Sequence, residues 1–167
     1  MTNSSNETAF TIDTSSIKFG PGITSEAGYE LSRLGATRVL VVTDPQLASS
    51  PAVQTAIDSL KKANIDHAVF DQVSVEPTDS SLKQAIKFAM EGRFDGFLPV
   101  GGGSSIDTAK AANLYSTYPA EFLEYVNAPI GKGTPVPGDL KPLVAVPTTA
   151  GTGSETTGVA IFDYEEL

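Results

Sequence analysis

Apolar positions along this chain follow two periods, one typical of buried strands and one typical of amphipathic helices. The runs RVLVVTD (38–44), HAVFDQV (67–73) and DGFLPV (95–100) are mostly apolar, as buried parallel strands are. Between these runs, apolar residues recur every three or four positions. Strands of about five residues that alternate with helices of about ten to fifteen predict repeated βαβ units. Right-handed crossovers then give a Rossmann-like, doubly wound and mostly parallel α/β sheet.

The helical stretches carry start and stop signals, namely polar caps, a proline at the first helical position and terminal glycines. These signals are Thr24 with Gly35, Ser50 with Pro51, and Thr78 or Asp79 with Gly92. Each stretch also has an apolar stripe that is expected to be buried. The three stripes are Ala27, Leu31 and Leu34; Val53, Ala56, Ile57 and Leu60; and Leu82, Ala85, Ile86 and Ala89.

Bulk composition restricts the class of protein. The chain has 167 residues, 40% of them hydrophobic and 19% charged, values that suit one globular domain with a core. A formal charge of −9 disfavours nucleic acid as a partner, and no apolar run approaches the ~20 residues of a membrane span. Residues 1–16 form a polar tail without a secretory or transit bias. We therefore expect a cytoplasmic protein whose domain spans residues 17–167.

Cysteine and histidine usage excludes two kinds of chemistry. The sequence has no cysteine, so it forms no disulfide and offers no thiolate. His67 is its one histidine, which rules out a histidine-rich metal site built from this chain alone. A Ser-His-Asp triad is disfavoured for the same reason, and His67 is expected to be structural.

The stretch LPVGGGSSIDTAKAANLY (98–115) places three glycines between a predicted strand and a helix expected from Ile106 to Tyr115. Gly101, Gly102 and Gly103 therefore form a turn at the carboxyl edge of the sheet, where open α/β sheets bind ligands. Glycine lets a phosphate approach the backbone, and a helix start adds free N–H groups and partial positive charge. This pattern predicts a pyrophosphate site. The alternative is a tight turn that needs glycine for its own geometry.

Two aspartates are candidate ligand contacts, one near a helix start and one after a strand. Asp107 is expected in the first turn of the helix, where the dipole favours a carboxylate, and Lys110 is spaced to pair with it. A ligand contact and a simple helix-end ion pair both fit Asp107. Asp44 directly follows a buried strand, where a carboxylate can accept hydrogen bonds from ribose hydroxyls. An Asp-Pro pair also starts turns, so a purely local role for Asp44 stays open.

A second loop of small residues follows another apolar stretch in LVAVPTTAGTGSETTGVAIFDY (143–164). Hydroxyls and exposed N–H groups in one loop suit phosphate, ribose or a carboxamide, although a flexible loop of small residues is the plainer alternative. The segment GVAIFDY (158–164) predicts a further strand. The six hydroxyl residues are Thr148, Thr149, Thr152, Ser154, Thr156 and Thr157.

The motifs GGGSSIDTAK and PTTAGTGSETT resemble the two nucleotide-domain signatures of the iron-containing (group III) alcohol dehydrogenases. The segments VEPTDSS, KAANLY and APIGKG are similar to the branch that contains hydroxyacid-oxoacid transhydrogenase. The resemblance covers roughly residues 17–167 and implies an NAD-binding domain. The family's second, helical domain, which holds Fe²⁺ or Zn²⁺ through one Asp and three His, has no counterpart in this sequence.

The resemblance implies a role for each matching residue. Asp44 would bind the adenosine ribose, and the absence of a basic residue after it favours NAD over NADP. Glu76 stands where many relatives carry an asparagine near the adenine. The other implied contacts are Gly102, Gly103 and Ser104 with the pyrophosphate; Asp107 with that turn or the cofactor; Thr148, Thr149 and Thr152 with phosphate, ribose or nicotinamide; Thr157 and Val159 with the nicotinamide end; and Gly153 near the substrate.

Two functional hypotheses follow. In the first, the parent enzyme is a metal-dependent dehydrogenase for a small alcohol, aldehyde or hydroxy acid, or a transhydrogenase that passes hydride from 4-hydroxybutyrate to 2-oxoglutarate through bound NAD(H). In the second, the chain is a non-catalytic nucleotide-binding module. The chain alone is predicted to be inactive. Apolar surface where the second domain would pack favours self-association into a homo-oligomer.

Overall fold

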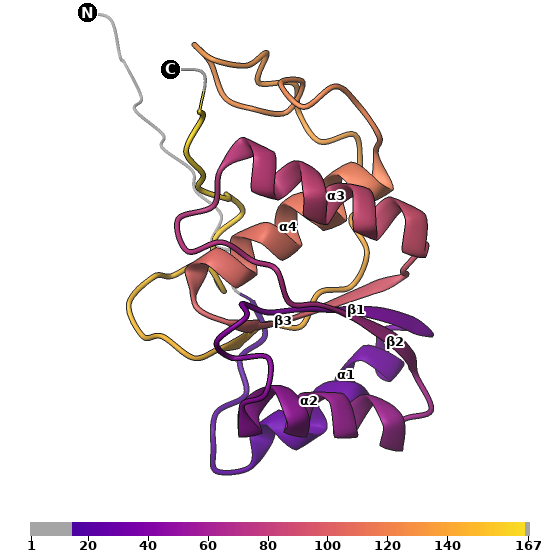
Figure 1. The fold of residues 1–167 in the computed structure, drawn as a ribbon. Helices are drawn as coiled ribbons and strands as arrows, with labels where there is room; N and C mark the ends of the chain where they lie inside the picture. Colours follow the sequence, from indigo (N-terminus) through magenta and orange to yellow (C-terminus); the bar gives the residue numbers. More distant parts are fainter. Residues whose placement is uncertain (1–14, 166–167) are drawn as a thin grey trace, which may run out of the picture.

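Four parallel strands form one sheet in the order β2-β1-β3-β4 in the computed structural model, which describes residues 15–165. The strands are β1 (Arg38–Val42), β2 (Asp66–Phe70), β3 (Gly96–Gly101) and β4 (Val146–Pro147). Helices α1 (Ala27–Arg33) and α2 (Pro51–Lys62) cover one face, and α3 (Asp79–Gly92) and α4 (Gly103–Thr117) cover the other (Figure 1). The predicted doubly wound α/β fold is confirmed.

The central strand β1 explains how two helix layers share one sheet. Successive side chains of a strand point to opposite faces. Val39 and Val41 join the core cluster that contains the α1 and α2 stripes, whereas Leu40 and Val42 join the cluster on the α3 and α4 side. Because both faces are covered, the strand reads as a continuous apolar run rather than an alternating one.

The predicted starts of α2 and α3 are confirmed by hydrogen bonds. The Ser50 hydroxyl accepts from the Val53 N–H at 3.3 Å, with Pro51 at the first helical position. Thr78 and Ser81 form a capping box at the start of α3. The predicted stripes of both helices are buried, so the periodicity of the sequence reports burial correctly here.

The first helix departs from its prediction. Gly22, with φ of +79°, turns the chain into a 3₁₀ helix (Ile23–Glu26) that continues as α1. Thr24 therefore lies inside this turn and does not cap it. Leu34 is 52% exposed because α1 ends at Arg33, one residue before it.

Three boundaries near the glycine-rich stretch also differ from expectation. Helix α4 begins at Gly103 rather than Ile106, so Asp107 lies beyond its first turn. Strand β4 spans just two residues, preceded by an isolated bridge between Phe97 and Leu143. The segment 158–164 is not a strand, and its one bridge joins Asp163 to Thr78.

Among the helices of residues 15–165, none has the length and apolar character to cross a membrane.

Candidate functional site

The candidate site lies at the carboxyl edge of the sheet, where the chain crosses over. From β1 the chain passes to β2 on one side, and from β2 it returns across β1 to β3. The carboxyl ends of β1 and β3 therefore flank a topological switch point, the usual ligand crevice of such sheets. Asp44 follows β1 and Gly102 follows β3. The Thr43 hydroxyl, which is buried, ties these two ends by donating to the Val100 carbonyl at 2.8 Å.

The start of α4 differs from the starts of α2 and α3 because its N-cap residue is Gly102, which has no side chain to cap the helix. The first N–H groups of any α-helix lack partners within the helix. In α4 the intrahelical ladder begins with Ile106, whose N–H donates to the Gly102 carbonyl at 3.2 Å. The N–H groups of Gly103, Ser104 and Ser105 precede it. They form an uncapped helix start that suits an anionic group.

The two loops singled out in the sequence lie against each other. A Cβ built on Gly102 would lie 3.1 Å from the Thr149 Oγ1, and one on Gly103 would lie 3.2 Å from the Thr152 Cβ. None of Gly101, Gly102 and Gly103 has a positive φ. Gly102 and Gly103 therefore allow the loops to approach each other, and Gly101 allows the close approach of Ser105, whose Oγ a Cβ at this glycine would overlap.

Residues 148–153 continue directly from β4. The Thr148 N–H donates to the Gly101 carbonyl at 2.9 Å, which extends the ladder between β3 and β4 by one bond. Gly151 and Gly153 adopt left-handed backbone, with φ of +106° and +71°, and this lets the loop turn back over the glycines. Thr148, Thr149 and Thr152 are exposed, so their hydroxyls are accessible at the edge where the pyrophosphate is predicted.

Asp44 is half-buried at the end of β1. Its Oδ1 accepts from the N–H groups of Gln46 at 2.9 Å and Leu47 at 3.0 Å, so the local turn proposed for an Asp-Pro pair is present. Within residues 15–165, its Oδ2 accepts no hydrogen bond, which leaves this oxygen available to a ribose hydroxyl. Glu76 lies exposed in the loop between β2 and α3, with φ of +56°.

Asp107 and Lys110 bring the far end of the second loop to α4. The Lys110 Nζ lies 3.4 Å from the Asp107 Oδ1, which confirms the predicted pairing. The same Nζ donates to the Val159 carbonyl at 2.8 Å and to the Thr157 hydroxyl at 3.3 Å. The Asp107 Oδ2 accepts from the Ile161 N–H at 3.1 Å. Asp107 is therefore directed at residues 157–161.

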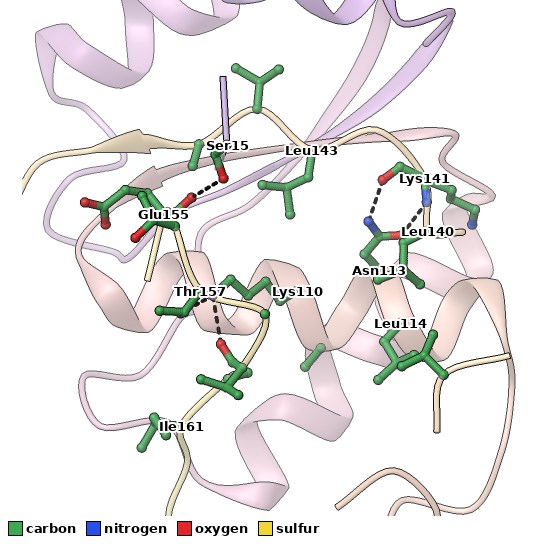
Figure 2. A pocket seen from close by; sticks show the side chains of 18 of the residues that line it. Ser15, Lys110, Asn113, Leu114, Leu140, Lys141, Leu143, Glu155, Thr157 and Ile161 are labelled. Carbon is green, nitrogen blue, oxygen red and sulfur yellow. Dashed lines mark hydrogen bonds between the residues drawn. The ribbon is translucent and has the colours of Figure 1, made fainter. Parts of the chain in front are cut away.

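A groove of about 1610 Å³ opens beside this part of α4. Figure 2 shows Lys110 and Asn113 on α4, with Thr157 beside Lys110 and Ile161 further along the same irregular segment. Several of its apolar lining residues are exposed, among them Ile17 (72%) and Ile161 (69%). The residues predicted at the nicotinamide end, Thr157 and Val159, thus line the groove, whereas the predicted pyrophosphate residues lie at the edge of the sheet.

Sequence reasoning left Thr43 out of the site and gave Ser154 and Lys110 no individual role in it. Thr43 joins β1 to β3 through a buried hydroxyl, and its position directly after a strand was the available signal. Ser154 is buried, with its Oγ 3.1 Å from a Cβ built on Gly103. Lys110 was considered only as the partner of Asp107, because no sequence pattern shows its bonds to residues 47 and 49 positions away.

The described residues contain no metal cluster, since residues 15–165 bring no three His, Asp or Glu side chains together in a way that could hold an ion. His67 is half-buried in β2, where it pairs with Val39 of β1. This position lies near the amino-terminal end of an outer strand, away from the carboxyl edge of the sheet.

Residues 14–167 match the profile of the iron-containing alcohol dehydrogenase family. The mitochondrial hydroxyacid-oxoacid transhydrogenase of Bos taurus is 61% identical over 160 residues, which cover 95% of this chain and 34% of that protein. A 1,3-propanediol oxidoreductase superposes with a TM-score of 0.83 at 30% identity, and an NADH-dependent butanol dehydrogenase A from Thermotoga maritima with 0.85 at 26%. These matches cover 95% of this chain and 41% and 39% of the two structures.

These matches confirm the resemblance read from the loop motifs, and they correct one expectation. The chain spans about a third of the length of the Bos taurus relative. The predicted cytoplasmic location is wrong, because that relative is a mitochondrial protein. The composition of a folded domain is a poor guide to compartment, since a targeting segment is removed and leaves the domain unchanged.

Proposed function

Because the chain belongs to the iron-containing alcohol dehydrogenase family, we propose that it is the NAD(H)-binding part of an oxidoreductase of that family. Hydride transfer between nicotinamide and an alcohol or hydroxy acid is the chemistry that the cofactor supplies when bound. The observation that carries the proposal is the uncapped start of α4 at the topological switch point, faced by the Thr149 hydroxyl and by the Thr152 side chain.

The residues at this edge fit three parts of a dinucleotide: the pyrophosphate, a ribose and the nicotinamide. The N–H groups of Gly103 and Ser104 would hold the pyrophosphate, because they precede the helical ladder and point out of the helix start. The free Oδ2 of Asp44 would accept a ribose hydroxyl and disfavour a 2′-phosphate, so NAD is preferred to NADP. Thr157 and Val159 would place the nicotinamide at the mouth of the groove. The Thermotoga maritima structure, whose name states NADH dependence, supports the same cofactor.

The proposed reaction of the whole enzyme is that of hydroxyacid-oxoacid transhydrogenase, the activity in the name of the 61% identical relative. Its Fe²⁺ or Zn²⁺ would polarise the substrate oxygen. The described residues offer no cluster for such an ion, so the chain by itself is proposed to bind cofactor without turning it over. We also propose that residues 17–167 act as one cofactor domain and that the exposed apolar groove promotes a homo-oligomer.

Titration of the purified chain with NADH and NADPH, together with a turnover assay on 4-hydroxybutyrate, tests this proposal. We expect saturable NADH binding, weaker NADPH binding and no turnover. Failure to bind NADH would refute the cofactor assignment. NAD-dependent oxidation by the chain alone would show instead that it carries its own catalytic groups.

A further inference from the structure

Residues 157–165 form an irregular segment that two aspartates hold against two helices. Residues 157–161 pass α4, and residues 163–165 pass the start of α3. Each contact uses a buried aspartate together with a lysine one helical turn further along. The aspartates, Asp107 and Asp79, are 6% and 4% exposed. We call this stretch the 157–165 segment.

The contact on α3 is reinforced by apolar packing. The Asp79 Oδ1 accepts from the Glu165 N–H at 3.2 Å, and Lys83 donates to the same carboxylate at 2.5 Å. The Lys83 ammonium holds the pKa of the Asp79 carboxyl below its usual range, together with the Glu165 N–H. The Phe162 ring packs edge-on against Phe122, with ring centroids 5.3 Å apart. The second half of the segment thus has both polar and apolar anchors.

The contact on α4 depends on polar groups. The side chains of Val159 and Ile161 are 54% and 69% exposed, so they contribute little burial energy at this point. The backbone here is held by the Lys110 Nζ, which donates to the Val159 carbonyl, and by the Asp107 carboxylate, which accepts from the Ile161 N–H. The Lys110 side chain is 18% exposed. The bonds donated by Lys110 and accepted by Asp107 are charge-assisted, and such hydrogen bonds are stronger than neutral ones.

We propose that Lys110, oriented by Asp107, is a positioning residue that fixes the nicotinamide half of the cofactor site. Lys110 bonds to Thr157 and Val159, the two residues assigned to the nicotinamide end, and within the described residues its hydrogen bonds include none to the glycine turn or to residues 148–153. This role rests on the proposed function. The proposal adds that the two halves of the cofactor site have separate supports. The pyrophosphate half is the glycine turn at the β3–α4 junction, and the nicotinamide half is held by the ion pair of Lys110 with Asp107.

The test compares two ligands on the full 167-residue chain and its Lys110→Met variant. ADP-ribose carries the pyrophosphate and adenosine without the nicotinamide, whereas NADH carries all three. We expect Lys110→Met to lower NADH affinity about tenfold and to leave ADP-ribose affinity within about twofold. Lys110→Arg keeps the charge and the donors, so it should restore most of the NADH affinity.

Lys141→Met is the matched control. Lys141 lines the same groove, but its Nζ donates to the Ser116 carbonyl and hydroxyl at the other end of α4. We expect both affinities to stay within about twofold of the wild-type values in this variant. Hydrogen exchange gives a reading that needs no ligand. Residues 157–161 should exchange faster in Lys110→Met, while the Glu165 amide should keep its protection.

Four outcomes separate this proposal from its alternatives and from the proposed function. Equal loss of NADH and ADP-ribose affinity in Lys110→Met would show a general structural role and overturn it. Unchanged NADH affinity, or unchanged exchange at residues 157–161, would also overturn it. A wild-type chain that binds neither ligand would instead refute the proposed cofactor function, and the exchange measurement would then decide whether Lys110 holds the segment.

Discussion

The sheet has an amino edge, where its parallel strands begin, and a carboxyl edge, where they end. The aspartates at these two edges differ in how fully their carboxylates are hydrogen-bonded. Asp95, just before β3, accepts four hydrogen bonds, from the Thr37 N–H to both oxygens, from the Thr37 hydroxyl and from the Arg38 N–H, at 2.5–3.0 Å. Asp44, just after β1, uses one oxygen for its own turn. The amino edge therefore satisfies its polar groups internally, and the carboxyl edge keeps donors and acceptors available.

This difference separates residues that stabilise the fold from residues that we propose bind a ligand. Asn113 belongs to the first group, since its amide donates to the Lys141 carbonyl and accepts from the Lys141 N–H, which fixes the chain before β4. The α4 start belongs to the second, since its N–H groups lie outside the helical ladder. Substitutions at the amino edge should cost stability, and substitutions at the carboxyl edge should cost affinity.

The largest effect is expected from Gly103→Val. The added Cβ would lie 3.1 Å from the Ser154 Oγ, and its methyl groups would fill the space above the α4 N–H groups. NADH affinity should fall ~100-fold or more, as read by fluorescence titration. Gly20→Ala is the control, because nothing lies within 4 Å of a Cβ at that glycine. Retained affinity in a folded Gly103→Val variant would remove the pyrophosphate from this turn.

Asp95→Ala should have the next largest effect, and on stability alone. Losing hydrogen bonds to a charged group should lower the free energy of unfolding by about 2 kcal/mol, measured by urea denaturation. NADH affinity should stay within about twofold of the wild-type value. A clear loss of affinity without a loss of stability would reverse the roles assigned to the two edges.

The same aspartate gives a pH dependence. Burial raises the pKa of the Asp95 carboxyl, but hydrogen bonds from Thr37 and the Arg38 N–H outweigh it and hold the pKa below its usual range. The stabilisation is therefore present above the pKa of an unfolded aspartate, near 4, and is lost as pH falls through the lower folded value. Urea denaturation between about pH 5 and 2 should show this loss in the wild type and a shallower one in Asp95→Asn.

Asp44→Asn should have a smaller effect, confined to cofactor choice. Asparagine keeps an oxygen for the Gln46 and Leu47 N–H groups, so the turn should survive. Removing the charge should reduce the preference for NADH over NADPH by about tenfold, as competition binding would show. An unchanged preference would leave Asp44 with its turn role alone.

Ser50→Ala should give the smallest effect and sharpen the contrast between helix starts. Loss of the bond from the Val53 N–H to the Ser50 hydroxyl should lower the free energy of unfolding by about 1 kcal/mol, measured by thermal denaturation. Cofactor affinity should not change, since α2 is closed by a protein side chain and α4 is not. A stability change near zero would mean that the Ser50 bond at 3.3 Å is too long to stabilise α2.

The sequence was sufficient to predict those strands and helices whose apolar positions are buried. Strands β1 and β3 and helices α2 and α3 were predicted correctly because their apolar positions are the buried ones. The segment 158–164 was misread as a strand because Val159 and Ile161 are apolar yet exposed. Its position depends on bonds to Asp107 and Lys110, which lie about 50 residues earlier, and no local pattern records such contacts.

The candidate site was predictable where its residues directly follow strands. The positions of Asp44 and Gly102 follow from strand ends of a parallel sheet, whose carboxyl ends share an edge. The start of α4 was placed three residues late because glycine is a poor helix former, although Gly103 is helical here. Gly102 and Gly103 are explained by close approach to Thr149 and Thr152 rather than by a left-handed turn. This reason depends on the positions of both loops in the folded structure, which the sequence pattern does not show.

Backbone amide shifts of the isotope-labelled chain on adding ADP-ribose show directly where the pyrophosphate binds. We expect the largest shifts at the N–H groups of Gly103, Ser104 and Ser105, where the pyrophosphate would bind the start of α4. The Thr37 and Arg38 amides at the opposite edge should not move. Absence of shifts at α4, or shifts centred on the amino edge, would contradict the assignment of the carboxyl edge as the cofactor site.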